Sequence, residues 1–122
     1  MTCPPREQVL TSTLVDIAVE SWRFLRLMDR VVNSLDADQQ RRVSTRFNYF
    51  QKRVIDALES VDLRLVLLEG SRFGPELAAT AVNAGDFGPG DDLVVDQTLE
   101  PVVMGPEGVV RSGTVTLRRA TP

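Results

Sequence analysis

The segment from Arg6 to Leu35, REQVLTSTLVDIAVESWRFLRLMDRVVNSL, decides the fold. Its apolar side chains recur at steps of three and four residues, which is the spacing of one face of an α-helix. The members of this row are Val9, Leu10, Leu14, Ile17, Phe24, Leu25, Met28, Val31, Val32 and Leu35, with the small Ser21 among them. Since neither proline nor glycine interrupts the row, we predict one amphipathic helix of about eight turns. So long a row has to be buried, and another helix is its usual partner.

A second amphipathic helix is predicted from Gln39 to Ser60. Asp36 or Asp38 can cap it, because a short carboxylate accepts hydrogen bonds from the free N–H groups of a first helical turn. Its apolar row is Val43, Phe47, Phe50, Val54, Ala57, Leu58 and Val61, and the cationic residues largely off that row are Arg41, Arg42, Arg46, Lys52 and Arg53. For these cations we expect a solvated face, with a partner-binding patch as the alternative.

The composition changes near Asp62, after which glycine, proline and aspartate become frequent. We predict strands over residues 63–68, 92–96, 101–104, 109–111 and 114–118, a turn over 71–75, a short helical turn over 76–82 and a loop over 84–92. Gly105-Pro-Glu-Gly108 is typical of a hairpin turn between two of these strands. The expected fold is therefore α+β, with a helical hairpin that serves dimerisation over residues 1–61 and a small β domain over 62–122.

The composition argues against side-chain catalysis. The chain of 122 residues has no histidine, which is the commonest general base and metal ligand in proteins. Its one cysteine, Cys3, stands before two prolines and has no second cysteine to pair with. With 43% apolar and 25% charged residues, the chain has the balance of an ordinary folded domain. We therefore expect a folded binding protein that is not an enzyme and that holds neither a metal nor a cofactor.

Charge and hydropathy narrow the class of partner. The net charge is −3, and no basic stripe with interleaved aromatic residues stands out, so nucleic-acid binding is not expected. No apolar run approaches the roughly 20 residues that a membrane span needs, so no membrane partner is expected either. The N-terminal MTCPPREQVL lacks the apolar core of a secretory signal. These features predict a cytoplasmic protein whose partners are other proteins.

The loop over residues 84–92 offers a different hypothesis, a small enzyme or ligand-binding domain. Gly85, Gly88 and Gly90 do not have the spacing of a phosphate-binding loop, and no Gly-Lys-Ser/Thr follows them. The acidic residues Asp86, Asp91 and Asp92 do not follow the ligand spacing of an EF-hand. An ordinary loop of a β domain is therefore the simpler interpretation.

From Phe24 onward, the order of features resembles GrpE, the nucleotide exchange factor of DnaK-type chaperones. Phe24-Leu-Arg-Leu-Met-Asp-Arg-Val-Val-Asn-Ser-Leu35 is similar to a leucine-rich stretch of that family around a central aspartate, here Asp29. Further similar segments, in the order of the family, are Ile55–Leu58, Leu63–Leu68, Phe73-Gly-Pro-Glu-Leu77, Asp92–Val95 and Val109–Val115. Each segment is short, and the ordered series, which covers about four fifths of the chain, carries the resemblance.

The resemblance implies an architecture and a partner. GrpE-like chains form homodimers through a four-helix bundle, two helices from each subunit, and their β domain opens the ATPase domain of a DnaK-type chaperone so that ADP leaves. On that basis, the expected contacts with the chaperone are Arg111, Met104, Val103 and Val109, around the predicted hairpin. The expected dimer contacts are Leu14, Ile17, Phe24, Leu25, Met28, Val32, Phe47, Phe50 and Val54.

Several positions depart from the family pattern. A glycine of the family's second bundle helix falls at or near Arg46, and a histidine of the family falls near Ala78. The Lys-Gly-Tyr triplet of the family is absent around Thr98–Pro101, and little of its long N-terminal helix has a counterpart here. These departures favour an alternative, in which the chain keeps the GrpE fold as a protein-interaction or scaffold module without exchange activity.

Overall fold

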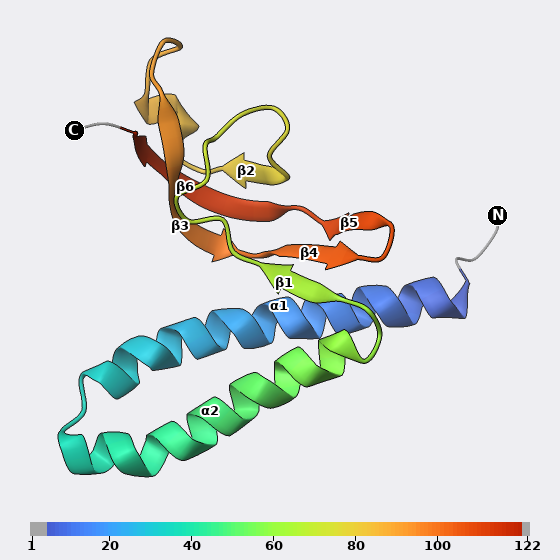
Figure 1. The fold of residues 1–122 in the computed structure, drawn as a ribbon, viewed down its shortest axis with the longest axis vertical. Coiled ribbons are helices and arrows are strands. Elements are labelled where there is room, and N and C mark those ends of the chain that lie inside the picture. Colours follow the sequence, from blue (N-terminus) through green and yellow to red (C-terminus); the bar gives the residue numbers. More distant parts are fainter. Residues whose placement is uncertain (1–4, 121–122) are drawn as a thin grey trace. The chain divides into compact units, whose positions relative to one another are not determined.

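In the computed structural model, which describes residues 5–120, the chain forms two compact units, residues 1–61 and 62–122. The first is helical and the second is built from short strands, so the fold class is α+β (Figure 1). We call them the helical unit and the β unit. Cys3 lies outside the described residues.

The helical unit consists of α1 (Arg6–Asn33) and α2 (Ala37–Glu59), joined by a short turn (Figure 1). Of the two predicted capping residues, Asp36 is the cap, because its side chain accepts a hydrogen bond of 2.9 Å from the backbone N–H of Gln39. Asp38 instead pairs with Arg41 one turn further along the helix. Both helices begin and end within two residues of the predicted bounds, because no residue inside them breaks the helical pattern. Within residues 5–120, neither helix has an apolar stretch long enough to cross a bilayer.

Over residues 62–120, the β unit contains six short strands arranged in two sheets. Their bounds are β1 (Arg64–Val66), β2 (Ala79–Ala81), β3 (Leu93–Glu100), β4 (Val102–Gly105), β5 (Gly108–Arg111) and β6 (Gly113–Arg119). One sheet has the order β1-β4-β5 and the other the order β2-β6-β3. The core of the unit is formed by Leu68, Val95, Val102, Val115 and Leu117, against which Phe73, Leu77 and Met104 also pack.

The chain passes from one sheet to the other three times, and the last two of these crossings, β3 to β4 and β5 to β6, are neighbours. Between β3 and β4 stands the buried Pro101, and proline has no N–H with which to continue a ladder of hydrogen bonds. Between β5 and β6 stands Ser112 alone, and Gly113 follows it at the start of β6. Backbone crowds this crossing, since a β-carbon on Gly113 would lie 2.7 Å from the carbonyl oxygen of Glu100. The absence of a β-carbon at Gly113 therefore allows the chain to cross from one sheet to the other at this crowded point.

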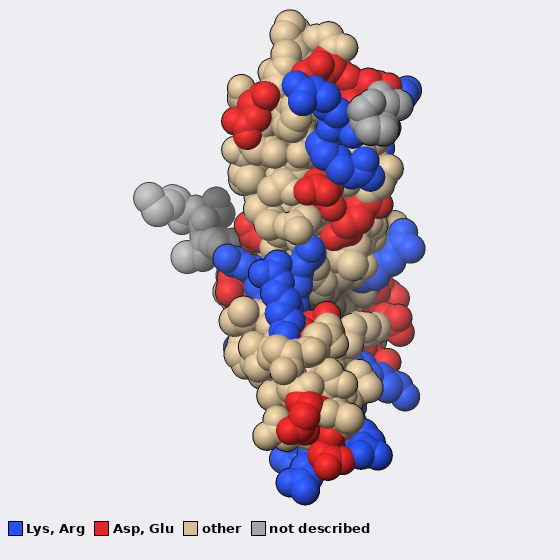
Figure 2. Space-filling view, turned by 90° about the vertical axis from the view of Figure 1, so that its left-hand side faces the viewer, with Lys and Arg blue, Asp and Glu red and all other residues tan. Residues whose placement is uncertain are grey.

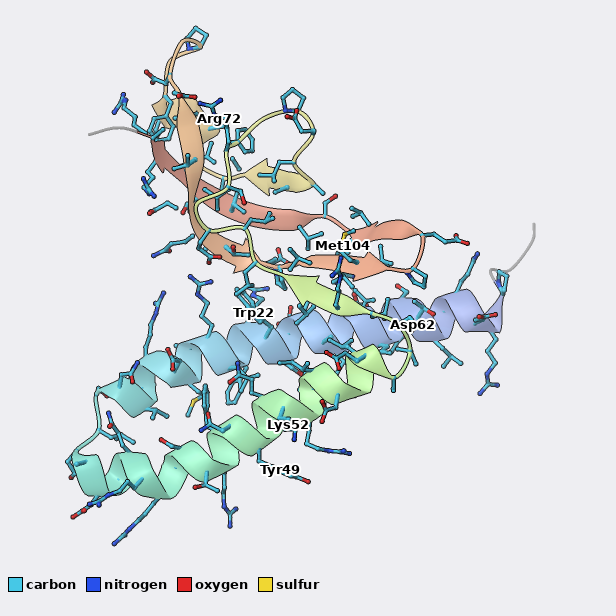
Figure 3. All side chains as sticks on the ribbon, in the orientation of Figure 1. Trp22, Tyr49, Lys52, Asp62, Arg72 and Met104 are labelled. Atoms are coloured by element: carbon cyan, nitrogen blue, oxygen red, sulfur yellow. The ribbon has the colours of Figure 1, made fainter. Side chains whose placement is uncertain are left out.

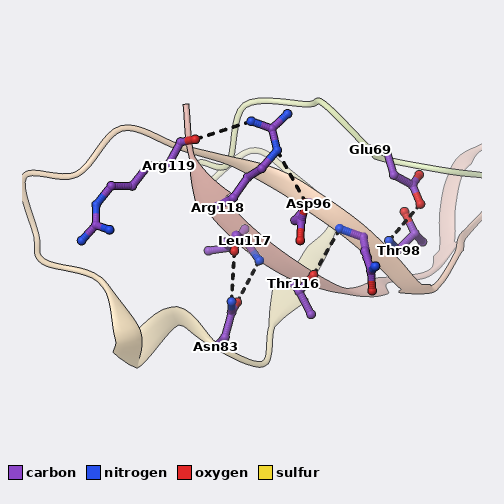
Figure 4. A network of polar contacts seen from close by, with 9 residues as sticks. Glu69, Asn83, Asp96, Thr98, Thr116, Leu117, Arg118 and Arg119 are labelled. Atoms are coloured by element: carbon purple, nitrogen blue, oxygen red, sulfur yellow. Dashed lines mark hydrogen bonds and ion pairs between the residues drawn. The ribbon is translucent and has the colours of Figure 1, made fainter. Parts of the chain in front are cut away.

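The segment before β2 covers the outer edge of β3. The N–H groups of Gly70 and Phe73 donate to the carbonyls of Val95 and Leu93, and Val95 N–H donates to the Ser71 carbonyl, each at 2.9 Å. An uncovered edge is a site of unwanted strand pairing, so this irregular segment protects β3. Figure 4 shows a further polar contact at the same edge, where the Thr98 N–H donates to the Glu69 carboxylate at 3.0 Å.

One element differs in kind from the prediction. The helical turn expected over residues 76–82 is wrong, because residues 79–81 form β2, which pairs in parallel with β6. Asn83 extends this pairing: its side-chain amide donates to the Leu117 carbonyl at 3.0 Å and accepts from the Leu117 N–H at 2.8 Å (Figure 4). Alanine and leucine near Pro75 suit a helix locally, but the partner of this strand lies more than thirty residues away.

Substitution of Gly113 by alanine tests the crossing of the sheets. We expect Gly113→Ala to lower the free energy of unfolding by about 1–3 kcal/mol, because the added methyl group meets backbone that cannot move aside. Urea denaturation followed by circular dichroism measures this change. Gly85→Ala is the matched control, since a β-carbon there has no heavy atom within 4 Å. Equal stability of the two variants would contradict a tight crossing.

Candidate functional site

The four residues expected to contact a partner come together on one antiparallel hairpin. In the β4–β5 pair, Val103 lies opposite Arg111, Met104 lies opposite Val109, and the turn closes between Gly105 and Gly108. Gly108 has a φ of +124°, a conformation that a residue with a β-carbon rarely adopts. Because β5 is the outer strand of its sheet, no strand of residues 5–120 lies beside its free edge.

The four side chains differ sharply in the surface that they expose. Val103 is 0% exposed, whereas Val109 is 49% exposed and its neighbour Val110 is 47% exposed. Met104 is half-buried and packs on the core of the β unit, so only part of its side chain could reach a partner. The apolar surface of this hairpin therefore belongs to Val109 and Val110, which we call the hairpin patch.

Arg111 and Val103 lie beside this patch and are less exposed than its two valines. Arg111 is half-buried and engages in interactions within the chain, so it is not a free cation awaiting a partner. Val103 pairs with Leu65 of β1 on one side and with Arg111 of β5 on the other, which makes it the middle of a three-strand row. In this conformation Val103 holds the hairpin in place and presents no surface of its own.

The loop over residues 84–92 uses its carboxylates internally. Asp92 pairs with Arg72 at 3.0 Å, and Asp91 pairs with Arg119 at 3.5 Å and accepts a hydrogen bond from the Gly88 N–H. Figure 2 shows basic and acidic side chains lying beside each other on the face that it draws. Within residues 5–120, no group of three or more acidic or cysteine side chains is placed to hold a metal ion. These contacts suit a folded loop and give a ligand no vacant carboxylate pair.

The residues expected at a dimer interface fall into three groups. Leu25 and Val32 are buried, and Leu14, Met28, Phe47 and Val54 are half-buried. Ile17, Phe24 and Phe50 are 59%, 56% and 44% exposed. On α1 the exposed members recur every seven residues, since Leu10 and Val31 are also exposed, at 56% and 44%. A seven-residue apolar repeat is the spacing by which one helix packs along another, so α1 has an apolar row left over.

Two features of the β unit have no distinctive sequence pattern, the exposure of Val110 and the burial of Thr98. Val110 lies in a predicted strand, and strict alternation along a strand exposes only one of two adjacent residues, so the pattern does not identify it as a surface residue beside Val109. Both valines are exposed on β5, an edge strand whose pairing with β4 shifts register at Val110, and such a shift interrupts the strict alternation. Thr98, which is 0% exposed, accepts a hydrogen bond of 3.0 Å from the Leu68 N–H, and no local pattern distinguishes it from a surface threonine.

No protein-family model, no curated protein and no solved structure matches this chain. What the chain does therefore has to be inferred from its own residues. The two surfaces that stand out are the hairpin patch and the apolar row of α1.

A matched pair of substitutions distinguishes support from contact on the hairpin. We expect Val103→Ala to lower the free energy of unfolding by about 2 kcal/mol, since it removes two buried methyl groups and leaves a cavity. Val109→Ala removes the same atoms from a half-exposed site and should change stability by less than about 0.5 kcal/mol. Thermal and urea unfolding of both variants give the comparison. A larger loss for Val109→Ala would mean that the hairpin is packed differently.

Proposed function

We propose that this protein is a co-chaperone that binds the ATPase domain of a DnaK-type chaperone and promotes the release of ADP. The observation that carries the proposal is the hairpin patch, two exposed valines on the edge strand of a three-stranded sheet, in a chain with the ordered GrpE-like segments. The architecture supports it, because two long helices followed by a small β unit are what that resemblance implies.

Nucleotide exchange needs no catalytic side chain. A protein that binds the open form of an ATPase more tightly than the closed form shifts the balance towards opening by that difference in affinity. Fully burying a valine contributes about 1.5–3 kcal/mol, so two half-exposed valines can contribute about 2 kcal/mol together. That free energy corresponds to about a thirtyfold preference for the open form. The hairpin patch is therefore large enough to act as a wedge, and further preference has to come from polar contacts around it.

A stable hairpin is part of this mechanism. A flexible hairpin would lose conformational entropy on binding, and that loss would reduce the difference in affinity between the open and the closed ATPase. Here the backbone of β4 is paired on both sides, with β1 and with β5. The hairpin patch thus lies on β5, next to β4, which is paired on both sides. Such a rigid surface suits a protein that has to push two lobes of a partner apart.

The exchange assay tests the proposal directly. We expect the protein to accelerate the release of fluorescently labelled ADP from a DnaK-type chaperone, and we expect Val109→Asp/Val110→Asp to abolish most of that acceleration. The charged side chains prevent burial of the patch, while their exposed sites leave the fold intact. Val82→Asp, at a residue of the β unit that is 61% exposed, is the control and should behave as the parent protein. If the parent neither binds the chaperone nor speeds release, the proposal is wrong.

We further propose a homodimer through a four-helix bundle. The support is the apolar row of α1, whose exposed members Leu10, Ile17, Phe24 and Val31 recur every seven residues. Exposed apolar surface of this regularity is uncommon on a solitary domain and is typical of an interface. In a bundle, two copies of the hairpin would cover each other's rows.

Light scattering tests the dimer. The parent chain of 13.5 kDa should scatter as a species of twice that mass, and Ile17→Asp/Phe24→Asp should scatter as a monomer at micromolar concentration. Both sites are more than half exposed, so the variant should keep its helical circular dichroism signal. Ser12→Asp, at an exposed polar site of the same helix, adds a charge outside the row and is the control. A monomeric parent chain would refute the bundle.

The alternative is an interaction or scaffold module of the same fold that has lost exchange activity. It is favoured by the residues at positions where the family pattern differs, among them Arg46 on α2 and Ala78 just before β2. Affinity capture that recovers only partners other than chaperones, together with no effect on ADP release, would favour this alternative. Robust exchange would exclude it.

A further inference from the structure

One stretch of α2 has cationic side chains that no acidic residue accompanies. Between Gln39 and Ile55, the helix contains five cationic residues and no acidic residue. Subtracting these five charges from the net charge of −3 leaves −8 on the rest of the chain. One stretch of helix is thus strongly basic in a protein that is otherwise acidic.

Three of the cations share one face of α2 with an aromatic ring. Arg42, Arg46, Tyr49 and Arg53 are spaced by four, three and four residues, so they form a single row of about 16 Å along the helix. We call this row the basic ridge. All four residues are exposed, Tyr49 by 66%. Figure 3 shows Tyr49 on the side of α2 that points away from α1.

The charges of the basic ridge are uncompensated within the described residues. Arg23 pairs with Glu20 and Arg41 pairs with Asp38 in the helical unit, and no acidic side chain of residues 5–120 pairs with the three ridge arginines. Like charges four residues apart on a helix, as at Arg42 and Arg46, repel each other and weaken the helix. The ridge therefore does not contribute to the stability of the fold.

The limits of the ridge identify the kind of partner. Asp38, four residues before Arg42, and Asp56, three residues after Arg53, fall on the same side of the helix and end the positive row at both ends. A nucleic acid strand carries charge along its whole length and would run past these carboxylates into an acidic protein. An acidic helix of a few turns fits between them, because its carboxylates recur with the same helical spacing as the arginines.

The apolar neighbours of the ridge favour an amphipathic partner. Phe50, which is 44% exposed, follows Tyr49 directly and lies at the edge of the row. Aromatic side chains and arginine are the residues that most often dominate protein interfaces. Arginine also forms paired hydrogen bonds with a carboxylate, which a lysine cannot do. We propose that the basic ridge docks an acidic amphipathic helix of a partner protein, independently of the hairpin patch.

The test uses the full chain and two matched double variants. Arg42→Gln/Arg53→Gln removes two charges from the ridge, and Arg41→Gln/Lys52→Gln removes two charges from the residues directly before them, about 100° around the helix. The probe is a fluorescein-labelled synthetic helix with glutamates at the ridge spacing and leucines beside them, and its control has glutamine at every glutamate. Fluorescence anisotropy gives the dissociation constants, and circular dichroism checks that both variants keep their helices.

We expect the parent chain to bind the glutamate helix and not the glutamine helix. The ridge variant should bind it about tenfold more weakly, and the control variant should change the dissociation constant less than about twofold. Equal weakening by the two variants, equal binding of the two helices or no binding of the glutamate helix would each overturn the proposal. So would a ridge-dependent preference for a single-stranded oligonucleotide or for phosphatidylserine vesicles. A monomer–dimer shift confined to the ridge variant in light scattering would also overturn it, because the ridge would then be a contact between copies.

Discussion

The apolar surface of α1 is the constraint on which the helical unit depends. A helix of 28 residues with apolar side chains on more than one row offers more surface than one neighbouring helix can cover. Val15, Ala18, Val19, Leu25 and Val32 are buried, yet the row that includes Ile17 and Phe24 remains exposed. The apolar side chains of α1 thus stabilise the helical hairpin and also leave apolar surface exposed to solvent. Such a surface suits a protein that acts by association, because burying it against another apolar face lowers the free energy.

The β unit meets a different constraint, since its strands are only three to eight residues long. Short strands give few ladder hydrogen bonds, and side chains supply additional ones. Asn83 imitates a backbone group opposite Leu117, Thr116 accepts from the Gln97 N–H, and Glu69 accepts from the Thr98 N–H (Figure 4). Within residues 5–120, no buried side-chain nitrogen or oxygen lacks a hydrogen-bond partner. These side-chain hydrogen bonds reinforce the β2-β6-β3 sheet of a unit that has only a small core.

The sequence predicts the helices well and the sheets only in part, for a physical reason. Helical hydrogen bonds join residues four apart, so the periodicity of α1 and α2 contains nearly all the information needed. Ala79–Ala81 forms a strand because it pairs with Gly113–Val115, and no local sequence pattern predicts so distant a partner. The same limit affects the site. Val103 and Val109 look alike in the sequence, and only the position of β4 inside its sheet and of β5 at its edge separates the buried residue from the exposed one.

The central position of β6 in its sheet affects how the protein folds during synthesis on the ribosome. β6 is the central strand between β2 and β3, yet it follows both in the chain. While the chain grows, β2 and β3 emerge before the strand that pairs with both of them, and Val95 and Leu93 lack the cover that β6 gives them. Synthesis at a few residues per second leaves them in that state for seconds, long compared with the formation of local structure. The helical unit, whose contacts are local, can fold in this interval, so the nascent chain passes through a stage in which its helices are formed and its sheet is not.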